Sequence, residues 1–377
     1  MEISSAKGCY IYDKQNNAYL DFIAGVSACS LGHSHPKVID AIKKQIDKYM
    51  HVMVYGEFIQ DPAIELTKML AKYLPKKITK TYLTNSGTEA IDGAMKMARR
   101  YTGRSEILAA KKAYHGNSYG ALSIMGFEKR KQPFRPLLTD IKFLEYNSLE
   151  EICKITKKTA AVILETIQGG AGFIEPKNNF LREIQNRCNK VGALFILDEI
   201  QPGFGRTGTL FGFENYNCTP DVVVVGKGLG GGMPIGAFSS SEKIMHSLSD
   251  QPQLGHITTF GGNPVIAASA LATLKEITNS NLINEIDEKE ALIRSILKHN
   301  LITEIRGKGL MLCLIMKNKE LSNKLVLKAH QKKLILFWLL YEPKAVRITP
   351  PLTISMIEIK NGCNIILEIL NEISEEC

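Results

Sequence analysis

The sequence predicts an α/β fold in which a large domain with a mostly parallel β-sheet carries a smaller α+β domain. Between about residue 79 and residue 280, short apolar runs alternate with amphipathic segments, which is typical of a parallel sheet covered by helices on both faces. After residue 281, charged helical segments and a hairpin pattern replace that alternation. We therefore expect residues 40–280 to form the large domain, and residues 1–39 and 281–377 to form the small one.

The expected elements follow from the spacing of the apolar residues. In the large domain, strands are expected at residues 80–84, 106–110, 160–166, 193–199, 221–227 and 233–238, and helices at residues 86–101 and 180–191. In the C-terminal part, a helix at residues 282–298 precedes a hairpin near residues 305–315, another helix, a strand at residues 346–348 and a closing helix. A strand pair at residues 9–22 is expected to join the small domain.

The composition is that of a globular protein without a nucleic-acid partner. The 377 residues are 45% hydrophobic and 23% charged, and 47 basic side chains against 38 acidic ones give a net charge of +9. The basic excess is spread over short runs without interleaved aromatics, such as residues 76–77, 111–112 and 129–131. Such runs favour solvated surface side chains over a nucleic-acid patch.

Cysteine spacing and hydropathy bear on metal sites and location. The eight cysteines include no C-x-x-C pair, so we expect no metal centre and no disulfide framework. The first eight residues lack an apolar signal core, and no stretch approaches the roughly 18 apolar residues that span a bilayer. We expect a soluble cytoplasmic protein with no membrane partner.

Polar residues follow three of the expected strands, at the edge where parallel α/β sheets bind ligands. The first group is Thr-Asn-Ser-Gly-Thr at residues 84–88, between a strand and a helix. The start of a helix offers free N–H groups and a partial positive charge to a phosphate, and Gly87 would let the phosphate approach the backbone. Ser and Thr are also favoured as ordinary helix caps, so a simple cap remains the alternative here.

The other two groups bring a buried acid and a buried lysine. Asp198 closes an apolar strand, where a carboxylate is costly unless it meets a cation or hydrogen-bond donors. A structural ion pair is the alternative to a functional role. Asp198 and Ile200 are two residues apart, so they point to the same side of the strand. Lys227 follows four valines and a glycine; an apolar setting disfavours the ammonium form and leaves an amine that can form a Schiff base with an aldehyde.

The glycines around Lys227 also match the sequence of a second motif, but not the structural context that this motif needs. Residues 226–231 read G-x-G-x-x-G after a strand, but a dinucleotide-binding fingerprint must open a helix, and residues 233–238 have the pattern of another strand. We therefore reject a dinucleotide site. A phosphate cradle, an acid and a lysine at three strand ends fit a cofactor with a phosphate, a pyridine nitrogen and an aldehyde, which is pyridoxal phosphate.

At this point the sequence strongly resembles the class III aminotransferases, the group that includes acetylornithine, ornithine and 4-aminobutyrate aminotransferases. The resemblance covers essentially the whole chain, and it implies the fold of the type I pyridoxal-phosphate transferases, with a seven-stranded sheet in the large domain. The matching motifs are Leu20-Asp21-Phe22, Gly32-His33-Ser34-His35-Pro36, Asn85-Ser86-Gly87-Thr88-Glu89-Ala90, Tyr114-His115-Gly116, Asp198-Glu199-Ile200-Gln201-Pro202-Gly203, Gly226-Lys227-Gly228, Thr258-Thr259-Phe260-Gly261-Gly262-Asn263-Pro264 and Arg347-Ile348-Thr349-Pro350-Pro351.

The resemblance implies a role for each residue around the cofactor ring. Lys227 would hold pyridoxal phosphate as an imine and then act as the base that moves the substrate's Cα proton. Asp198 would pair with the ring nitrogen and keep it protonated. Tyr114 would stack on one face of the ring and Ile200 would pack on the other, and Gln201 would bond the ring hydroxyl.

The resemblance also implies a phosphate site that two subunits share. Ser86, Gly87 and Thr88 would hold the phosphate, and Thr259, with its neighbour Thr258, would reach it from a second subunit. His115 belongs to the same cofactor site. The implied assembly is a homodimer with shared active sites. Without the family context, Tyr114 reads as a core residue and the pair after it as a turn.

Two departures from the family pattern concern the substrate. Acetylornithine and ornithine enzymes usually have an arginine where this chain has Asn117, and a glutamate where it has Gly170. That glutamate normally pairs with the C-terminal arginine, here Arg347. We therefore predict that Arg347 is free to bind a substrate carboxylate, bidentately by preference, and we assign Asn117 to the substrate pocket as well.

The sequence thus predicts an aminotransferase that moves an amino group from an amino acid or ω-amine to a 2-oxo acid such as 2-oxoglutarate. N-acetylornithine or ornithine is the first choice of donor. The alternatives are a 4-aminobutyrate, lysine or alanine aminotransferase, an aminomutase or racemase, a decarboxylating transaminase, and a protein that keeps the cofactor only for structure.

Overall fold

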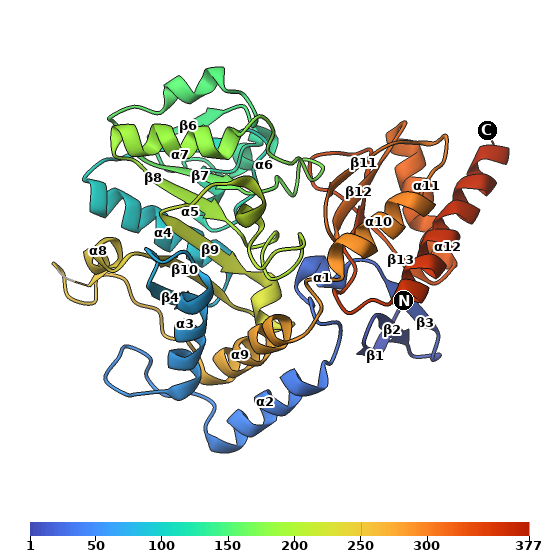
Figure 1. Cartoon of the computed structure of the whole chain (residues 1–377), viewed down its shortest axis with the longest axis horizontal. Helices are drawn as coiled ribbons and strands as arrows, with labels where there is room; N and C mark the ends of the chain where they lie inside the picture. Colours follow the sequence, from blue (N-terminus) through green and yellow to red (C-terminus); the bar gives the residue numbers. More distant parts are fainter. Residues whose placement is uncertain (250, 377) are drawn as a thin grey trace.

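The computed structural model describes residues 1–249 and 251–376, and it shows a large unit and a small unit side by side (Figure 1). The large unit is built on one seven-stranded sheet with the strand order β4-β10-β9-β8-β7-β5-β6. β10 runs antiparallel to both of its neighbours, and all other neighbouring pairs are parallel. The predicted mostly parallel sheet of seven strands is confirmed. Its strands are β4 (Lys80–Thr84), β5 (Glu106–Ala110), β6 (Ile141–Leu144), β7 (Thr159–Glu165), β8 (Leu194–Asp198), β9 (Val222–Gly226) and β10 (Gly236–Ser240).

The central strands are apolar throughout because both faces of the sheet are covered. Along β9, Val223 and Val225 belong to one hydrophobic core, whereas Val222 and Val224 belong to another. This is the alternation that a strand imposes on successive side chains. Helix α7 (Phe180–Val191) contributes to the first core and helix α4 (Gly87–Thr102) to the second, so the two helices lie on opposite faces.

The predicted strand at residues 233–238 begins later than expected. β10 starts at Gly236, because Pro234 has no backbone N–H with which to pair. Between β9 and β10 the chain forms only a single short 3₁₀ turn, Lys227–Gly230. A dinucleotide fingerprint opens a helix, whereas here the G-x-G-x-x-G letters are followed by strand β10.

The small unit combines segments from the two ends of the chain, coloured blue and red in Figure 1. One sheet joins β11 (Ile302–Lys308), β12 (Met311–Met316), β15 (Ala345–Ile348) and β14 (Phe337–Trp338). Another joins β1 (Ile3–Lys7), β2 (Tyr10–Asp13), β3 (Ala18–Asp21) and β13 (Leu334–Ile335). β3 pairs in parallel with β13, which binds the N-terminal strands to the C-terminal segment.

Long helices complete both units, and short ones connect them. Around the large sheet lie α2 (Pro36–Lys48), α3 (Asp61–Tyr73) and α9 (Pro264–Asn279), and in the small unit α10 (Ile286–Ile296), α11 (Lys319–Gln331) and α12 (Met356–Glu375). The short helices are α1 (Ala24–Ser27), α5 (Tyr119–Ser123), α6 (Glu128–Lys131) and α8 (Glu242–Met245), with 3₁₀ turns at Gln132–Phe134, Glu150–Lys154, Gly212–Tyr216 and His246–Leu248. α10 begins four residues later than residue 282, because residues 281–285 form a turn closed by the Asn284 N–H on the Asn281 carbonyl.

We propose a division into two domains that differs slightly from the predicted ranges. Residue 40 falls inside α2, and Val38 of that helix packs in the core of the large unit. The small unit has a core of its own, to which Leu20 and Phe22 contribute together with α10, α11 and α12. A boundary just before Pro36 therefore fits the packing better than one at residue 40.

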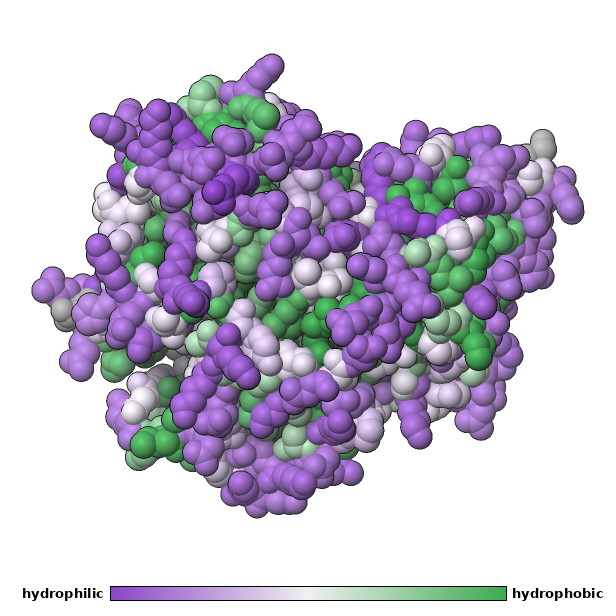
Figure 2. All heavy atoms as spheres, viewed as in Figure 1, coloured by the Kyte–Doolittle hydropathy of each residue, from purple (hydrophilic) through white to green (hydrophobic). Residues whose placement is uncertain are grey.

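None of the helices in residues 1–249 and 251–376 combines the length and the apolar character needed to cross a bilayer. Hydrophilic side chains cover most of the face seen in Figure 2 on both units. Within the same residues, no group of three or more His, Cys, Asp or Glu side chains is placed to hold a metal ion.

The contact between Phe22 and α12 should limit stability. A Cβ added to Gly362 would overlap the ring of Phe22, which is fully buried. Gly→Ala inside a helix normally stabilises by about 1 kcal/mol, but overpacking a core costs about 1–3 kcal/mol. We expect Gly362→Ala to lower the free energy of unfolding in urea. Lys360→Ala, at an exposed position of the same helix, is the control, and a Gly362→Ala variant as stable as the wild type would contradict the packing argument.

Candidate active site

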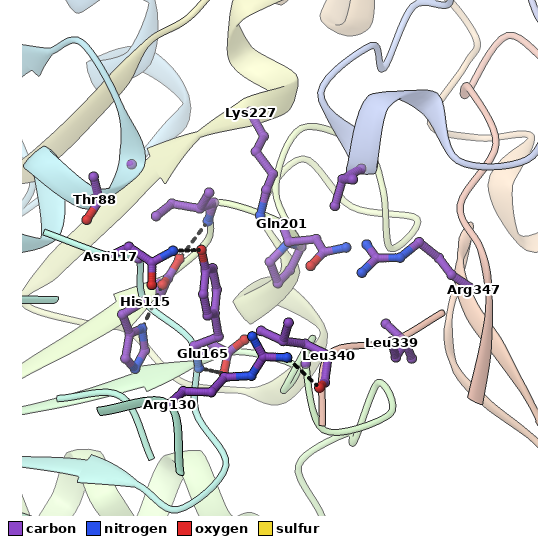
Figure 3. A pocket seen from close by; sticks show the side chains of 18 of the residues that line it. Thr88, His115, Asn117, Arg130, Glu165, Gln201, Lys227, Leu339, Leu340 and Arg347 are labelled. Atoms are coloured by element: carbon purple, nitrogen blue, oxygen red, sulfur yellow. Dashed lines mark hydrogen bonds and ion pairs between the residues drawn. The ribbon is translucent and has the colours of Figure 1, made fainter. Parts of the chain in front are cut away.

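A cavity of about 680 Å³ lies at the carboxyl ends of the central strands, where the small unit meets the sheet. Strand ends, the start of α4 and the segment after β5 form one side, and β14, β15 and the loop between them form the other. Figure 3 shows side chains from both units pointing into this space. The cavity is lined by Val26, Gly87, Thr88, Tyr114, His115, Gly116, Asn117, Arg130, Glu165, Gly170, Asp198, Ile200, Gln201, Pro202, Lys227, Phe337, Trp338, Leu339, Leu340 and Arg347.

Lys227 follows β9 directly and extends its amine into the cavity (Figure 3). Its backbone has a φ of 36°, a left-handed conformation that is costly for a residue with a side chain. Burial lowers the pKa of the Lys227 amine below its ordinary value, and Arg347 adds to this effect while Asp198 opposes it. The strained lysine therefore presents an amine with an increased neutral fraction, which is the form that attacks carbonyl groups.

Asp198 ends β8, next to β9, and its carboxylate is held from two directions. Oδ1 accepts a hydrogen bond from the Ile200 N–H at 2.9 Å, and Oδ2 lies 2.7 Å from Nδ1 of His115. Burial opposes protonation of His115, but the hydrogen bond and the negative charge of Asp198 raise its pKa overall. Nε2 of His115 is buried without a partner in the described chain. The acid is thus fixed in position by the imidazole and faces the cavity that Lys227 enters.

The start of α4 forms a third wall, with Gly87 and Thr88 at the cavity. A Cβ on Gly87 would lie 2.6 Å from Cδ1 of Ile200, so only glycine fits there. Ser86 is the N-cap of the helix, and its hydroxyl accepts from the Glu89 N–H at 3.4 Å. The predicted cap is therefore present, and the helix terminus with its free N–H groups still faces the cavity, as an anion site requires.

Tyr114, Asn117 and Gln201 occupy the remaining positions that the sequence assigned to the cavity. Asn117 Nδ2 donates to the Tyr114 hydroxyl at 3.2 Å (Figure 3), so a neutral amide stands on this wall. Gln201 Nε2 donates to the Ser27 hydroxyl at 3.3 Å. The structure brings all of the predicted cavity residues of this chain together except Ser86, Thr258 and Thr259.

Thr258 and Thr259 lie away from this cavity. Thr258 accepts a hydrogen bond from Asn85 Nδ2 at 3.0 Å and lines a separate hollow, and Thr259 is exposed. The prediction assigned Thr259 to the site of a second subunit, which a single chain does not test. Both roles stay predictions.

Arg347 stands in the middle of β15 and points into the cavity opposite the sheet (Figure 3). The side chain is buried, it forms no ion pair with a described residue, and its Nε and Nη1 atoms have no hydrogen-bond partner there. Its guanidinium lies over the Phe173 ring at 5.6 Å. Burial lowers the pKa of Arg347 to about 10, so it keeps its charge at neutral pH. A buried charge without an ion-pair partner is costly, and an anion entering the cavity would reduce that cost.

Gly170 leaves room for an aromatic ring. A Cβ on Gly170 would lie 3.0 Å from two carbons of the Tyr341 ring, and the Tyr341 N–H donates to the Gly170 carbonyl at 2.9 Å. The ring therefore takes the space beside residue 170 where a larger side chain would project.

The α/β fold places a lysine amine and a buried carboxylate in one cavity at the edge of the large sheet. The comparisons with known proteins agree: the family described as Aminotransferase class-III matches residues 1–370. The chain belongs to the class III aminotransferase family. It is a transaminase, and the family implies pyridoxal phosphate as its cofactor.

Individual relatives agree with this assignment. An acetylornithine aminotransferase of Caldanaerobacter subterraneus is 37% identical, over 97% of this chain and 94% of its own. A [LysW]-aminoadipate semialdehyde/glutamate semialdehyde transaminase of Sulfolobus acidocaldarius is 35% identical over 83% and 81%. The solved ornithine aminotransferase of Toxoplasma gondii superposes with a TM-score of 0.92 at 28% identity, over 100% of this chain and 91% of its own.

Three residues near the cavity were not singled out from the sequence. Glu165 closes β7 as Asp198 closes β8, so the same signal, an acid after an apolar run, could have revealed it. Its carboxylate accepts from the backbone N–H groups of Tyr114 and Gly169, at 3.1 and 2.9 Å. Arg130 was assigned to a solvated basic run, and Tyr341 carries no motif; only the folded chain places them here.

Glu165 should give the protein a pH-dependent stability. Burial raises the pKa of its carboxyl from 4.5 to about 7. The folded state then binds a proton that the unfolded state has already lost, so this group destabilises the fold progressively as pH rises from about 4.5 to about 7.

We expect Glu165→Gln, which has no charge to bury, to be more stable relative to the wild type at pH 7.5 than at pH 5, by urea unfolding at both values. Glu183→Gln, at an exposed position of α7, is the control and should show no such difference. A stability difference that stays constant with pH would show that the Glu165 carboxyl titrates normally.

Proposed function

We propose that this transaminase binds pyridoxal phosphate in the cavity through Lys227 and transfers the amino group of N-acetylornithine or ornithine to a 2-oxo acid such as 2-oxoglutarate. The observation that carries the proposal is the Lys227 amine, whose pKa is lowered by burial, in one cavity with the Asp198 carboxylate of the neighbouring strand. The relatives named acetylornithine aminotransferase and the solved ornithine aminotransferase support the choice of donor.

The residues present fit this cofactor. Gly87 keeps the start of α4 open for a phosphate, because any Cβ would meet Ile200. Asp198 would hold a proton on the ring nitrogen, and His115 keeps that carboxylate in place. Tyr114 and Ile200 would pack against the two ring faces. When bound, pyridoxal phosphate supplies an aldehyde that condenses with amines and a ring that accepts electrons from the substrate's Cα.

The further assignments rest on fewer contacts. Gln201 would bond the ring hydroxyl, and Ser86 and Thr88 would contribute to the phosphate site. The Thr88 hydroxyl lies 2.6 Å from the Ser118 hydroxyl and accepts from the Ser118 N–H at 3.0 Å, so it is already oriented. Lys227 would move the proton between the Cα of the substrate and the cofactor; a lowered pKa brings its amine closer to the working pH of a general base.

Arg347 would bind a carboxylate of the substrate. The Arg347 side chain lines the cavity, two of its nitrogens have no partner in the described chain, and a guanidinium can donate bidentately to a carboxylate. Asn117 and Gly170, which depart from the family pattern, lie on the same cavity wall and open the choice of donor to 4-aminobutyrate, lysine and alanine. An aminomutase on the same cofactor is the alternative.

We further propose a homodimer with shared active sites. Thr259 stands in a loop with the exposed apolar side chains Leu254, Ile257 and Phe260, which are 48%, 49% and 56% accessible. Exposed apolar groups cluster at residues 50–59 as well, and the two segments are joined where Asn263 Nδ2 donates to the Met50 carbonyl at 3.1 Å. A contiguous apolar surface of this kind is typical of a subunit interface, and a second copy covering it would receive Thr259.

A cytoplasmic location remains a prediction; the free thiols of the seven described cysteines suit a reducing compartment.

A donor panel with a Lys227 variant tests the proposed reaction. Purified holoenzyme is incubated with N-acetylornithine, ornithine, 4-aminobutyrate, lysine, alanine or aspartate, each with 2-oxoglutarate or pyruvate, and the new amino acid is measured. We expect the highest kcat/KM with N-acetylornithine or ornithine and 2-oxoglutarate. Lys227→Arg should reduce transamination by at least about 10²–10⁴-fold, the contribution of a positioned base.

Borohydride reduction gives a readout apart from turnover. The peptide containing Lys227 should gain the mass of one phosphopyridoxyl group in the wild type and none in Lys227→Arg. Lys131→Arg, at another buried lysine that does not line the cavity, is the matched control and should keep both the label and the activity. Label on a different lysine, or full turnover by Lys227→Arg, would refute the assignment. An aminomutase would instead rearrange the donor without consuming a 2-oxo acid.

Arg347→Lys tests carboxylate binding. Lysine retains the charge but loses the planar fork, and hydrogen bonds to charged groups contribute about 1.5–3 kcal/mol. We expect KM for carboxylate-containing donors to rise by about tenfold or more, with kcat changed less. Arg306→Lys, on the nearby strand β11 outside the cavity lining, should leave KM unaltered. An unchanged KM in Arg347→Lys would refute this role.

A further inference from the structure

The cavity receives a second guanidinium, from Arg130, on a wall separate from Arg347. Arg130 belongs to the short helix α6, in a run of three basic residues whose side chains have different surroundings. Lys129 is exposed, and Lys131 is buried against the Phe143 ring at 4.3 Å. Arg130 is also exposed, but its side chain lines the cavity. In Figure 3 Arg130 approaches from the side opposite Lys227, and Arg347 from the small unit.

Arg130 is oriented by an aromatic support. Its guanidinium carbon lies over the Tyr341 ring at 5.7 Å, and Nη2 donates a long hydrogen bond of 3.4 Å to the Leu340 carbonyl. The Tyr341 ring is stacked on Phe127 at 4.7 Å, and it occupies the space that Gly170 leaves free. Such contacts restrict the rotamers of a long side chain before any ligand arrives, which reduces the entropy lost on binding.

The charge of Arg130 is not matched within the described chain. It forms no ion pair with a residue of 1–249 or 251–376, whereas its neighbours Lys131 and Arg135 both pair with Glu128. Glu165 also lines the cavity near Arg130, but its carboxylate accepts from the backbone N–H groups of Tyr114 and Gly169, and it forms no ion pair with Arg130. Besides Lys227 and the Asp198-bound His115, Arg130 and Arg347 are the basic side chains among the cavity residues described.

We infer that Arg130 is a specificity-determining residue that binds the second carboxylate of a dicarboxylate substrate, while Arg347 holds the first. The substrate class is then a 2-oxo dicarboxylic acid and the matching amino dicarboxylic acid, because two separated guanidinium groups are each satisfied by one carboxylate. This inference deepens the proposed function and rests on the same cavity being the substrate site.

Binding of unreactive acids tests the inference without turnover. Glutarate has two carboxylates and butyrate has one, so any interaction with Arg347 is common to both, and their affinity ratio reports the second carboxylate. Isothermal calorimetry on the holoenzyme should show glutarate bound about 10- to 100-fold more tightly, as expected for a charge-assisted bidentate contact. Arg130→Gln should abolish that advantage and leave butyrate affinity unchanged, and Arg130→Lys should retain part of it.

Lys129→Gln removes the same charge from the same helix, at an exposed position outside the cavity lining, and should keep the full ratio. The inference is overturned if wild-type protein binds the two acids equally, if Arg130→Gln keeps the glutarate advantage, or if Lys129→Gln loses it as well. None of these results depends on transamination. If the binding results contradict the prediction while the donor panel shows transamination, only the role of Arg130 is refuted. If the donor panel shows no transamination while the preference for glutarate is present, the proposed reaction is refuted instead.

Discussion

The register between β8 and β9 is the constraint on which the site depends. Asp198 pairs with Val224, and the Glu199 N–H donates to the Val224 carbonyl at 2.8 Å, so β8 ends just before β9 delivers Lys227. A shift of one residue would turn every side chain of a strand to the opposite face. Because both strands are buried on both faces, the apolar packing that holds the large unit together also fixes acid and amine relative to one another.

Burial at this edge of the sheet acts on both signs of charge. It lowers the pKa of Lys227 and of Arg347, and it raises the pKa of Glu165 to about 7 and of Glu199 to about 8. The acids are stabilised locally: Glu199 accepts from the N–H groups of Gly212 and Phe213, and Glu165 from two other backbone donors. Arg347 has no such partner among residues 1–249 and 251–376. The buried surroundings that destabilise the two carboxylates also strengthen the attraction between a charge and its counter-ion. Arg347 would therefore interact strongly with an anion that entered the cavity.

The sequence predicted the parts of this arrangement that local patterns encode. Four valines before Lys227 and four apolar residues before Asp198 predict buried parallel strands and place both groups at one sheet edge, and the structure has β8 and β9 within a residue of the expected ends. Arg130 and Tyr341 could not be found this way, because residues 130 and 341 meet only through tertiary packing of α6 against the loop after β14. The sequence of a basic run is the same whether all of its side chains face solvent or one of them points into a cavity. Thr259 is different again: its predicted role needs a second chain.

Asn117 and Gly170 are connected structurally through the loop that carries Tyr341. A glycine at residue 170 admits the tyrosine ring, the ring supports Arg130, and an amide at residue 117 adds no charge of its own to the same wall. Arg347 forms no ion pair with a described residue, and its Nε and Nη1 atoms have no partner there. These residues place two guanidinium groups around the lysine and the acid. Lys227 and Asp198 follow or end strands of the large sheet, whereas Asn117, Arg130 and Tyr341 lie in short connecting segments, so these segments can vary while the sheet is kept.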